Sequence, residues 1–102
     1  MQPGGFDEIR RNRVHSNEQL FRSANEAREA DAVRHGTPPA SELDFICECG
    51  EVSCTTRIHL PLEKYREIHE NPKRFAVQPG HELPEFEEVV EAGDGFTVVE
   101  KY

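Results

Sequence analysis

All three cysteines of the chain lie within one eight-residue segment, Cys47-Glu48-Cys49-Gly50-Glu51-Val52-Ser53-Cys54. An odd number of cysteines does not form a closed disulfide framework, and a reducing cytoplasm keeps thiols free. Thiolates are strong ligands for zinc, and zinc prefers four donors in a tetrahedron. Gly50 allows the tight bend that a loop around an ion requires. The segment therefore predicts a metal site built from Cys47, Cys49, Cys54 and one further donor.

Histidine is the expected fourth ligand, and two histidines compete for the position. His81 follows Pro79-Gly80 in a predicted turn, from which a side chain can reach a distant loop. His59 would close a more compact site, but strand alternation places it on the face opposite the core residues beside it. We therefore expect His81, with His59 as the alternative. The other histidines are expected to be structural or exposed: His15, His35 and His69.

The expected cofactor is Zn2+, and an iron–sulfur cluster is the alternative because cysteine and histidine also ligate iron. A domain of about 60 residues buries little surface, so we expect zinc to act as a structural staple. Four protein ligands leave no coordination position for water, and no zinc-protease, deaminase or phosphate-loop motif is present. An enzyme is therefore not expected. Thiol redox chemistry at Cys47 and Cys49 is a further alternative, which the neighbouring acids oppose.

The composition is that of one small acidic domain. The chain has 102 residues, of which 35% are hydrophobic and 31% charged, and its net charge is −8. Residues 41 to 102 contain six basic and fourteen acidic side chains, which account for the whole imbalance. We therefore expect a protein partner, while nucleic acid is possible but disfavoured. No signal peptide and no apolar run long enough for a membrane span is evident, so a cytoplasmic location is expected.

Residues 1 to 15 are polar and lack periodicity, which predicts a flexible arm. The arm contains the one basic cluster of the chain, Arg10, Arg11 and Arg13. Clustered arginines can contact phosphate groups. They support an alternative function, a zinc protein associated with nucleic acid.

Residues 16 to 36 predict an amphipathic helix. Ser16 and Gln19 match the capping-box spacing, and Gly36 is a typical helix end. Apolar residues recur on one side at spacings of three and four, namely Leu20, Phe21, Ala24, Ala27 and Val33. We expect this face to cover the domain. The alternative is a partner-binding or dimerising surface that includes Leu20 and Phe21.

Residues 43 to 102 predict a small zinc-binding α+β domain. Alternating apolar residues predict strands at 43 to 47, 55 to 60, 75 to 77, 86 to 91 and 96 to 101, and the last two form a hairpin. Pro61 and the spacing of Leu62, Tyr65 and Ile68 predict a short helix. The expected fold class is α+β: an N-terminal helix, then a small, mostly antiparallel sheet with one short helix, stapled by a metal.

A set of short motifs follows in order along this domain: Phe45-Ile46-Cys47-Glu48-Cys49, Cys54, Ile58-His59-Leu60, Tyr65, Pro72, Phe75, Pro79-Gly80-His81-Glu82 and Val98-Val99-Glu100-Lys101. Together with Asn17-Glu18 and Asn25-Glu26 in the preceding helix, they resemble a family of small, uncharacterised, chiefly actinobacterial proteins. The chain departs from the family at Pro61, where a threonine helix cap is expected. The resemblance implies a bacterial protein in which Cys47, Cys49, Cys54 and His81 act together as a metal site. It implies no activity.

These observations lead to one expected function and two alternatives. We expect a zinc-binding Cys3His protein that acts as an interaction or regulatory module, with its acidic face meeting a basic surface of a protein partner. The first alternative is the nucleic-acid-associated protein that uses the arginine cluster. The second is an iron–sulfur or thiol redox protein.

Overall fold

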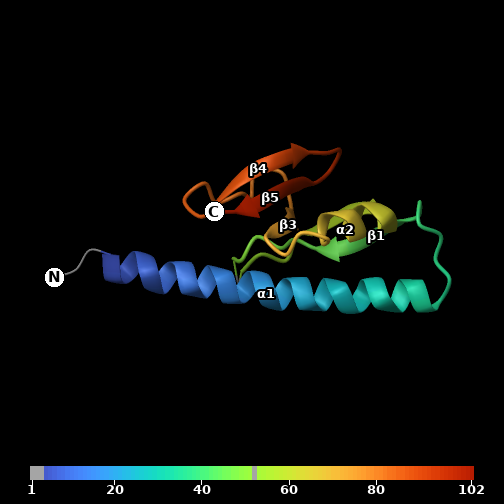
Figure 1. The fold of residues 1–102 in the computed structure, drawn as a ribbon, viewed down its shortest axis with the longest axis horizontal. Helices are drawn as coiled ribbons and strands as arrows, with labels where there is room; N and C mark the ends of the chain where they lie inside the picture. The colour runs from blue at the N-terminus through green and yellow to red at the C-terminus, as the bar shows by residue number, and fades with distance from the viewer. Residues whose placement is uncertain (1–3, 52) are drawn as a thin grey trace.

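The computed structural model describes residues 4–51 and 53–102, and the first three residues of the predicted arm lie outside this part. Its elements follow in the order α1 (Gly4–Arg34), β1 (Glu42–Ile46), β2 (Arg57–Pro61), α2 (Leu62–Ile68), β3 (Arg74–Val77), β4 (Glu87–Ala92) and β5 (Thr97–Lys101). Figure 1 shows α1 running along one side of the body that the strands and α2 form. The predicted α+β fold class is confirmed. Neither helix in the described residues is both long and apolar enough to cross a bilayer.

The strands form two antiparallel sheets. β1 pairs with β2, and the second sheet has the order β3-β5-β4. In β2 the buried residues alternate with exposed ones, whereas β3 and β5 each bury three consecutive residues. The apolar core cluster draws its members from residues 45 to 99, including Phe45, Ile58, Phe75 and Val99. The small domain therefore has a core of its own, to which helix α1 adds no member.

Helix α2 closes this core on one side. Pro61 precedes it in an extended conformation, with φ of −61°, and this ring geometry suits a helix start. Leu62, Tyr65 and Ile68 are buried, as their spacing predicts. The rings of Phe45 and Tyr65 stack with their centroids 4.1 Å apart. This contact fixes α2 against strand β1.

Helix α1 begins at Gly4, so residues 4 to 15 are helical and the predicted flexible arm is wrong there. The Ser16 and Gln19 spacing that resembled a helix start lies inside the helix. Two contacts hold the N-terminal part against the domain. Arg10 donates to Glu85 at 2.6 Å, and its guanidinium lies 5.1 Å from the centroid of the Phe86 ring. Arginine and glutamate are also good helix formers, so the polar composition did not prevent a helix.

The face of α1 that contacts the domain is polar, so the predicted apolar inner face is wrong. Leu20 is 65% exposed and Val33 is 47% exposed. Ala24 and Ala27 are exposed as well, and Phe21 is half-buried. The buried positions are instead Val14, Glu18, Arg22 and Asn25.

Hydrogen bonds from Arg22 to backbone carbonyls of the domain explain this orientation. The Arg22 guanidinium donates to the carbonyl oxygens of His69, Asn71, Pro72 and Arg74, at 2.8 to 3.5 Å, and lies 5.3 Å from the centre of the Phe75 ring. These carbonyls belong to the segment between α2 and β3 and to the first residue of β3. Leaving a buried carbonyl without a donor costs more than exposing one leucine, since an unpaired polar group loses its water. The polar face therefore turns inward.

A buried pair of carboxyl groups lies where α1 meets the second sheet. Glu18 of α1 accepts from Lys101 Nζ at 2.6 Å, and Glu87 of β4 accepts from the Leu83 amide at 3.1 Å. Burial, and then the hydrogen bond with Glu18, raise the pKa of Glu87 from 4.5 to about 8. A proton shared between the two carboxyl groups removes the repulsion of two buried negative charges.

This pair predicts that the protein loses stability as the pH rises. Between pH 4.5 and about 8 the unfolded Glu87 is ionised while the folded Glu87 keeps its proton. The free energy of unfolding therefore falls across this window and levels off above it. Glu87→Gln keeps a donor for Glu18 and cannot ionise, so its advantage over wild type should grow with pH, by on the order of 3 kcal/mol. Urea unfolding of both proteins at several pH values measures the difference, and parallel pH profiles would contradict the assignment.

Candidate metal centre

Two loops bring the predicted ligands together, one between β1 and β2 and one between β3 and β4. Cys47 and Cys49 directly follow strand β1, Cys54 lies in the loop before β2, and His81 lies in the turn between β3 and β4. The Glu48 amide donates to the Ala76 carbonyl at 2.9 Å, which places the end of β1 beside the end of β3. The backbone at Gly80 has φ of +92°, and the His81 amide donates to the Gln78 carbonyl at 2.9 Å. This turn directs His81 toward the thiols.

The four ligand atoms form one compact group. The Sγ atoms of Cys47, Cys49 and Cys54 and a ring nitrogen of His81 all lie within 4.8 Å of one another. His81 Nδ1 lies 3.6 Å from the Sγ atoms of both Cys47 and Cys54. Zinc bound tetrahedrally by sulfur and nitrogen separates these donors by about 3.6 Å, given the usual bond lengths. The donor set and its spacing fit one metal ion.

The thiols divide into a proton donor and an acceptor. The hydrogen bond from Cys47, supported by the Glu51 backbone amide, His81 and Cys54, lowers the pKa of Cys49 to about 5. The same hydrogen bond and then burial raise the pKa of Cys47, although the Gln78 amide donates to its sulfur at 3.1 Å. Cys49 is thus a thiolate at neutral pH. A metal would displace the remaining thiol protons, because the thiolate is the ligand form.

His59 does not reach this group. It lies on strand β2 with its side chain 62% exposed, and its Nε2 is 3.2 Å from Asp44 Oδ1 on the neighbouring strand. Because Ile58 and Leu60 point into the core, His59 between them points outward, as strand alternation predicted. His15 and His35 are exposed. His69 is the one histidine whose side chain is buried in a polar network.

That network centres on Glu48, which the sequence reasoning did not identify as a structural residue. Glu48 lies between the ligands Cys47 and Cys49 in the sequence, and its side chain is fully buried. The carboxylate accepts from Asn25 Nδ2 at 2.9 Å, the Tyr65 hydroxyl at 2.8 Å and the Ala76 amide at 2.8 Å, and His69 Nε2 lies 3.2 Å away. The partners of Glu48 include Asn25 of α1 and Tyr65 of α2, whose polar groups were the available sign of a buried acid. Glu48 thus anchors the Cys47-Glu48-Cys49 segment to both helices and to β3.

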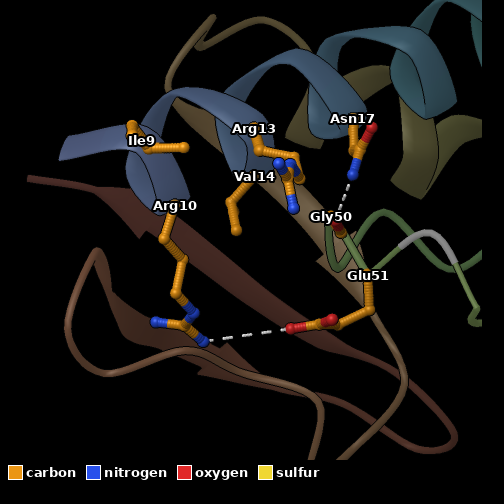
Figure 2. A pocket seen from close by; sticks show the side chains of 7 residues that line it. All are labelled: Ile9, Arg10, Arg13, Val14, Asn17, Gly50 and Glu51. Atoms are coloured by element: carbon orange, nitrogen blue, oxygen red, sulfur yellow. Dashed lines mark hydrogen bonds and ion pairs between the residues drawn. The ribbon is translucent and has the colours of Figure 1, made fainter. Parts of the chain in front are cut away.

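The predicted partner-binding residues lie along α1. Arg10 pairs with Glu85, and Arg11 lies 5.9 Å from the centre of the same Phe86 ring that Arg10 contacts. Figure 2 shows Arg10 and Arg13 at a cavity of about 560 Å3 between α1 and the Gly50 and Glu51 backbone. The arginine cluster therefore faces the acidic domain, whereas Leu20 is directed to solvent.

The geometry predicts opposite results for the two candidate histidines. His81→Ala removes a donor within 3.6 Å of two thiols and should weaken zinc binding by more than about 100-fold, the upper range for losing a supporting residue. His59→Ala should leave zinc affinity unchanged because its side chain contacts Asp44 instead. Competition with a chelator of known zinc affinity measures both variants. Equal losses, or a loss only in His59→Ala, would contradict the assignment of His81.

Comparisons with protein-family models, with curated proteins and with solved structures return no match to this chain. The resemblance to the actinobacterial proteins stays a prediction from the motifs. The functional conclusions below are therefore based on the side-chain geometry of the chain itself.

Proposed function

We propose that this protein is a zinc-stapled, non-enzymatic interaction module that works in the cytoplasm. The observation that carries the proposal is the convergence of Cys47, Cys49, Cys54 and His81 on one point. The three cysteines are free thiols. A reducing compartment would keep them available for a metal, which supports a cytoplasmic location.

Zinc is the metal that best suits this donor set. All four ligand atoms lie within 4.8 Å of one another, and His81 Nδ1 lies 3.6 Å from two of the sulfurs, the separation expected around a single zinc ion. The ligands of an iron–sulfur cluster stand farther apart because they bind different iron atoms. Three thiolates and one imidazole in a tetrahedral arrangement are typical of structural zinc sites.

The staple would join loops of both sheets, in addition to the apolar core that the sheets and α2 share. The ligands lie after β1, before β2 and between β3 and β4, so one ion would connect both sheets. Structural zinc contributes on the order of 10 kcal/mol to the folding of small domains. Four protein donors fill the coordination shell and leave no position for water or substrate. This argument supports a structural role over a catalytic one.

The surface chemistry supports a protein partner with a basic surface. The exposed acids on α2, just after it and on β4 include Glu63, Glu67, Glu70 and Glu88. The arginines that could have bound phosphate groups are turned toward the domain, where Arg10 contacts Glu51 and Glu85. An acidic surface accelerates encounters with a basic partner and repels nucleic acid. This distribution of charge favours a protein partner.

The zinc assignment predicts a colourless protein with one zinc per chain. Elemental analysis of freshly purified protein measures the metal, and substitution with Co2+ should give the intense visible bands of a tetrahedral thiolate site. Chelation should lower the midpoint of urea unfolding because metal binding is linked to folding. Brown protein that contains iron and sulfide would support the redox alternative.

The partner assignment predicts that binding depends on the acids of α2. Immobilised wild-type protein should retain its partner at low salt and release it at high salt, since exposed charges are screened. The variant Glu63→Gln, Glu67→Gln, Glu70→Gln should capture less of the same partner, measured by mass spectrometry. The variant Arg10→Ala, Arg11→Ala, Arg13→Ala is the control. A loss confined to this control, or recovery of nucleic acid, would support the alternative function.

A further inference from the structure

Helix α1 supplies no metal ligand, yet it contacts the metal loop on both sides of Cys49. The loop comprises residues 46 to 51, which contain two of the four ligands. Side chains of Asn25, Asn17 and Val14 reach it from the helix. The apolar core cluster includes no α1 residue, so these contacts do not result from general burial.

Asn25 holds the loop just before and between the first two cysteines. Its side-chain amide exchanges two hydrogen bonds with the backbone of Ile46, each 2.8 Å long, in the way that a neighbouring strand would. Its Nδ2 also donates to Glu48 Oε2 at 2.9 Å. Asn25 is 1% exposed, so the loss of these bonds could not be compensated by water. One side chain thus fixes the residue before Cys47 and the residue after it.

Asn17 and Val14 hold the loop on the other side of Cys49. Figure 2 shows the Asn17 amide directed at Gly50, whose carbonyl accepts its hydrogen bond at 2.8 Å. Gly50 has φ of +82°, and a Cβ atom added there would lie 2.8 Å from Val14 Cγ1. The backbone of the loop therefore lies directly against the helix. Any change in the path of the loop at Gly50 must move α1 or break this contact.

Three other side chains of α1 make hydrogen bonds to parts of the domain outside the metal loop. Arg22 binds the carbonyls of the segment after α2, and Glu18 pairs with Lys101 of β5. Arg28 donates to the Asp44 carbonyl on β1. The helix is thus attached at several points, and the contacts of Asn25, Asn17 and Val14, with the ion pair of Arg10 and Glu51, depend on the geometry of the loop.

We infer that Asn17 and Asn25 are positioning residues of the metal centre, and that metal binding and the docking of α1 stabilise each other. The inference rests on the proposed function, because it requires that the four ligands bind a metal. A metal fixes the loop in the shape that α1 contacts, and α1 holds the loop in the shape that the metal requires. Such coupling is reciprocal, so each event strengthens the other by the same factor.

The first experiment measures zinc affinity in variants of α1 by chelator competition. Asn25→Ala and Asn17→Ala should each weaken zinc binding by about 10 to 100-fold, the usual range for residues that support metal ligands. Leu20→Ala is the matched control on the same helix, since its side chain is exposed and contacts no loop residue. Val98→Ala is a second control, a truncation in the core of β5 that lowers stability and leaves every side chain of α1 in place. If Val98→Ala weakens zinc binding as much as Asn25→Ala, the effect is general destabilisation and the inference is wrong.

The second experiment measures the reverse direction by hydrogen exchange of the full chain with and without zinc. Removing zinc should reduce amide protection in residues 14 to 25 by about 10-fold or more, matching the loss of affinity in the variants. Protection in β3 and β5 should fall less. Unchanged protection of α1, or equal loss throughout the chain, would overturn the coupling. A protein that binds no zinc fails the proposed function as well, whereas zinc binding that Asn25→Ala leaves unchanged fails the coupling alone.

Discussion

The carboxylate of Glu48 is the interaction on which the arrangement of the other elements depends. It is completely buried, and a buried charge is tolerated only when its lone pairs are satisfied. Its partners come from α1, α2 and β3, so moving any of these elements leaves the charge with a missing donor. The penalty for a lost partner at a buried charge is large, because no water replaces it. Glu48 therefore specifies one relative position of the two helices and the second sheet.

The same logic explains why α1 can dock without an apolar stripe. The hydrophobic effect is non-directional, so apolar contacts alone fix the exact position of a helix on its domain less strictly than hydrogen bonds do. The contacts of Asn25 and Arg22 are directional and allow one register only. The Arg22 guanidinium donates to four backbone carbonyls between His69 and Arg74. Specificity here comes from paired polar groups, whereas the apolar core holds the sheets and α2 together.

The parts of the structure that follow local rules could be predicted from the sequence, and the parts that depend on distant polar groups could not. The alternation in 96 to 101 gave the terminal hairpin, and the donor chemistry of three cysteines and a turn histidine gave the cluster. The inner face of α1 was predicted wrongly because hydrophobic periodicity considers only apolar side chains such as Leu20. It contains no information on the backbone carbonyls of residues 69 to 74, to which Arg22 donates. Those carbonyls exist only in the folded chain. In the sequence, nothing distinguishes the buried Arg22 and Asn25 from arginine and asparagine residues on the exposed face of a helix.

A short seam between β1 and β3 shows how the polar network and the metal site support each other. The Ala76 amide donates to the Glu48 carboxylate, and the Gln78 amide donates to the Cys47 sulfur. The Ala76 carbonyl in turn accepts from the Glu48 amide. The amides of Ala76 in β3 and of Gln78 just after it thus bind the side chains of Glu48 and Cys47. No regular strand pairing joins the two sheets at this point. An amide hydrogen bond to sulfur favours the thiolate, the form that a metal requires. The Gln78 amide thus partly offsets the hydrogen bond with Cys49 and the burial that raise the pKa of Cys47, and the seam that connects the two sheets also holds this ligand in place.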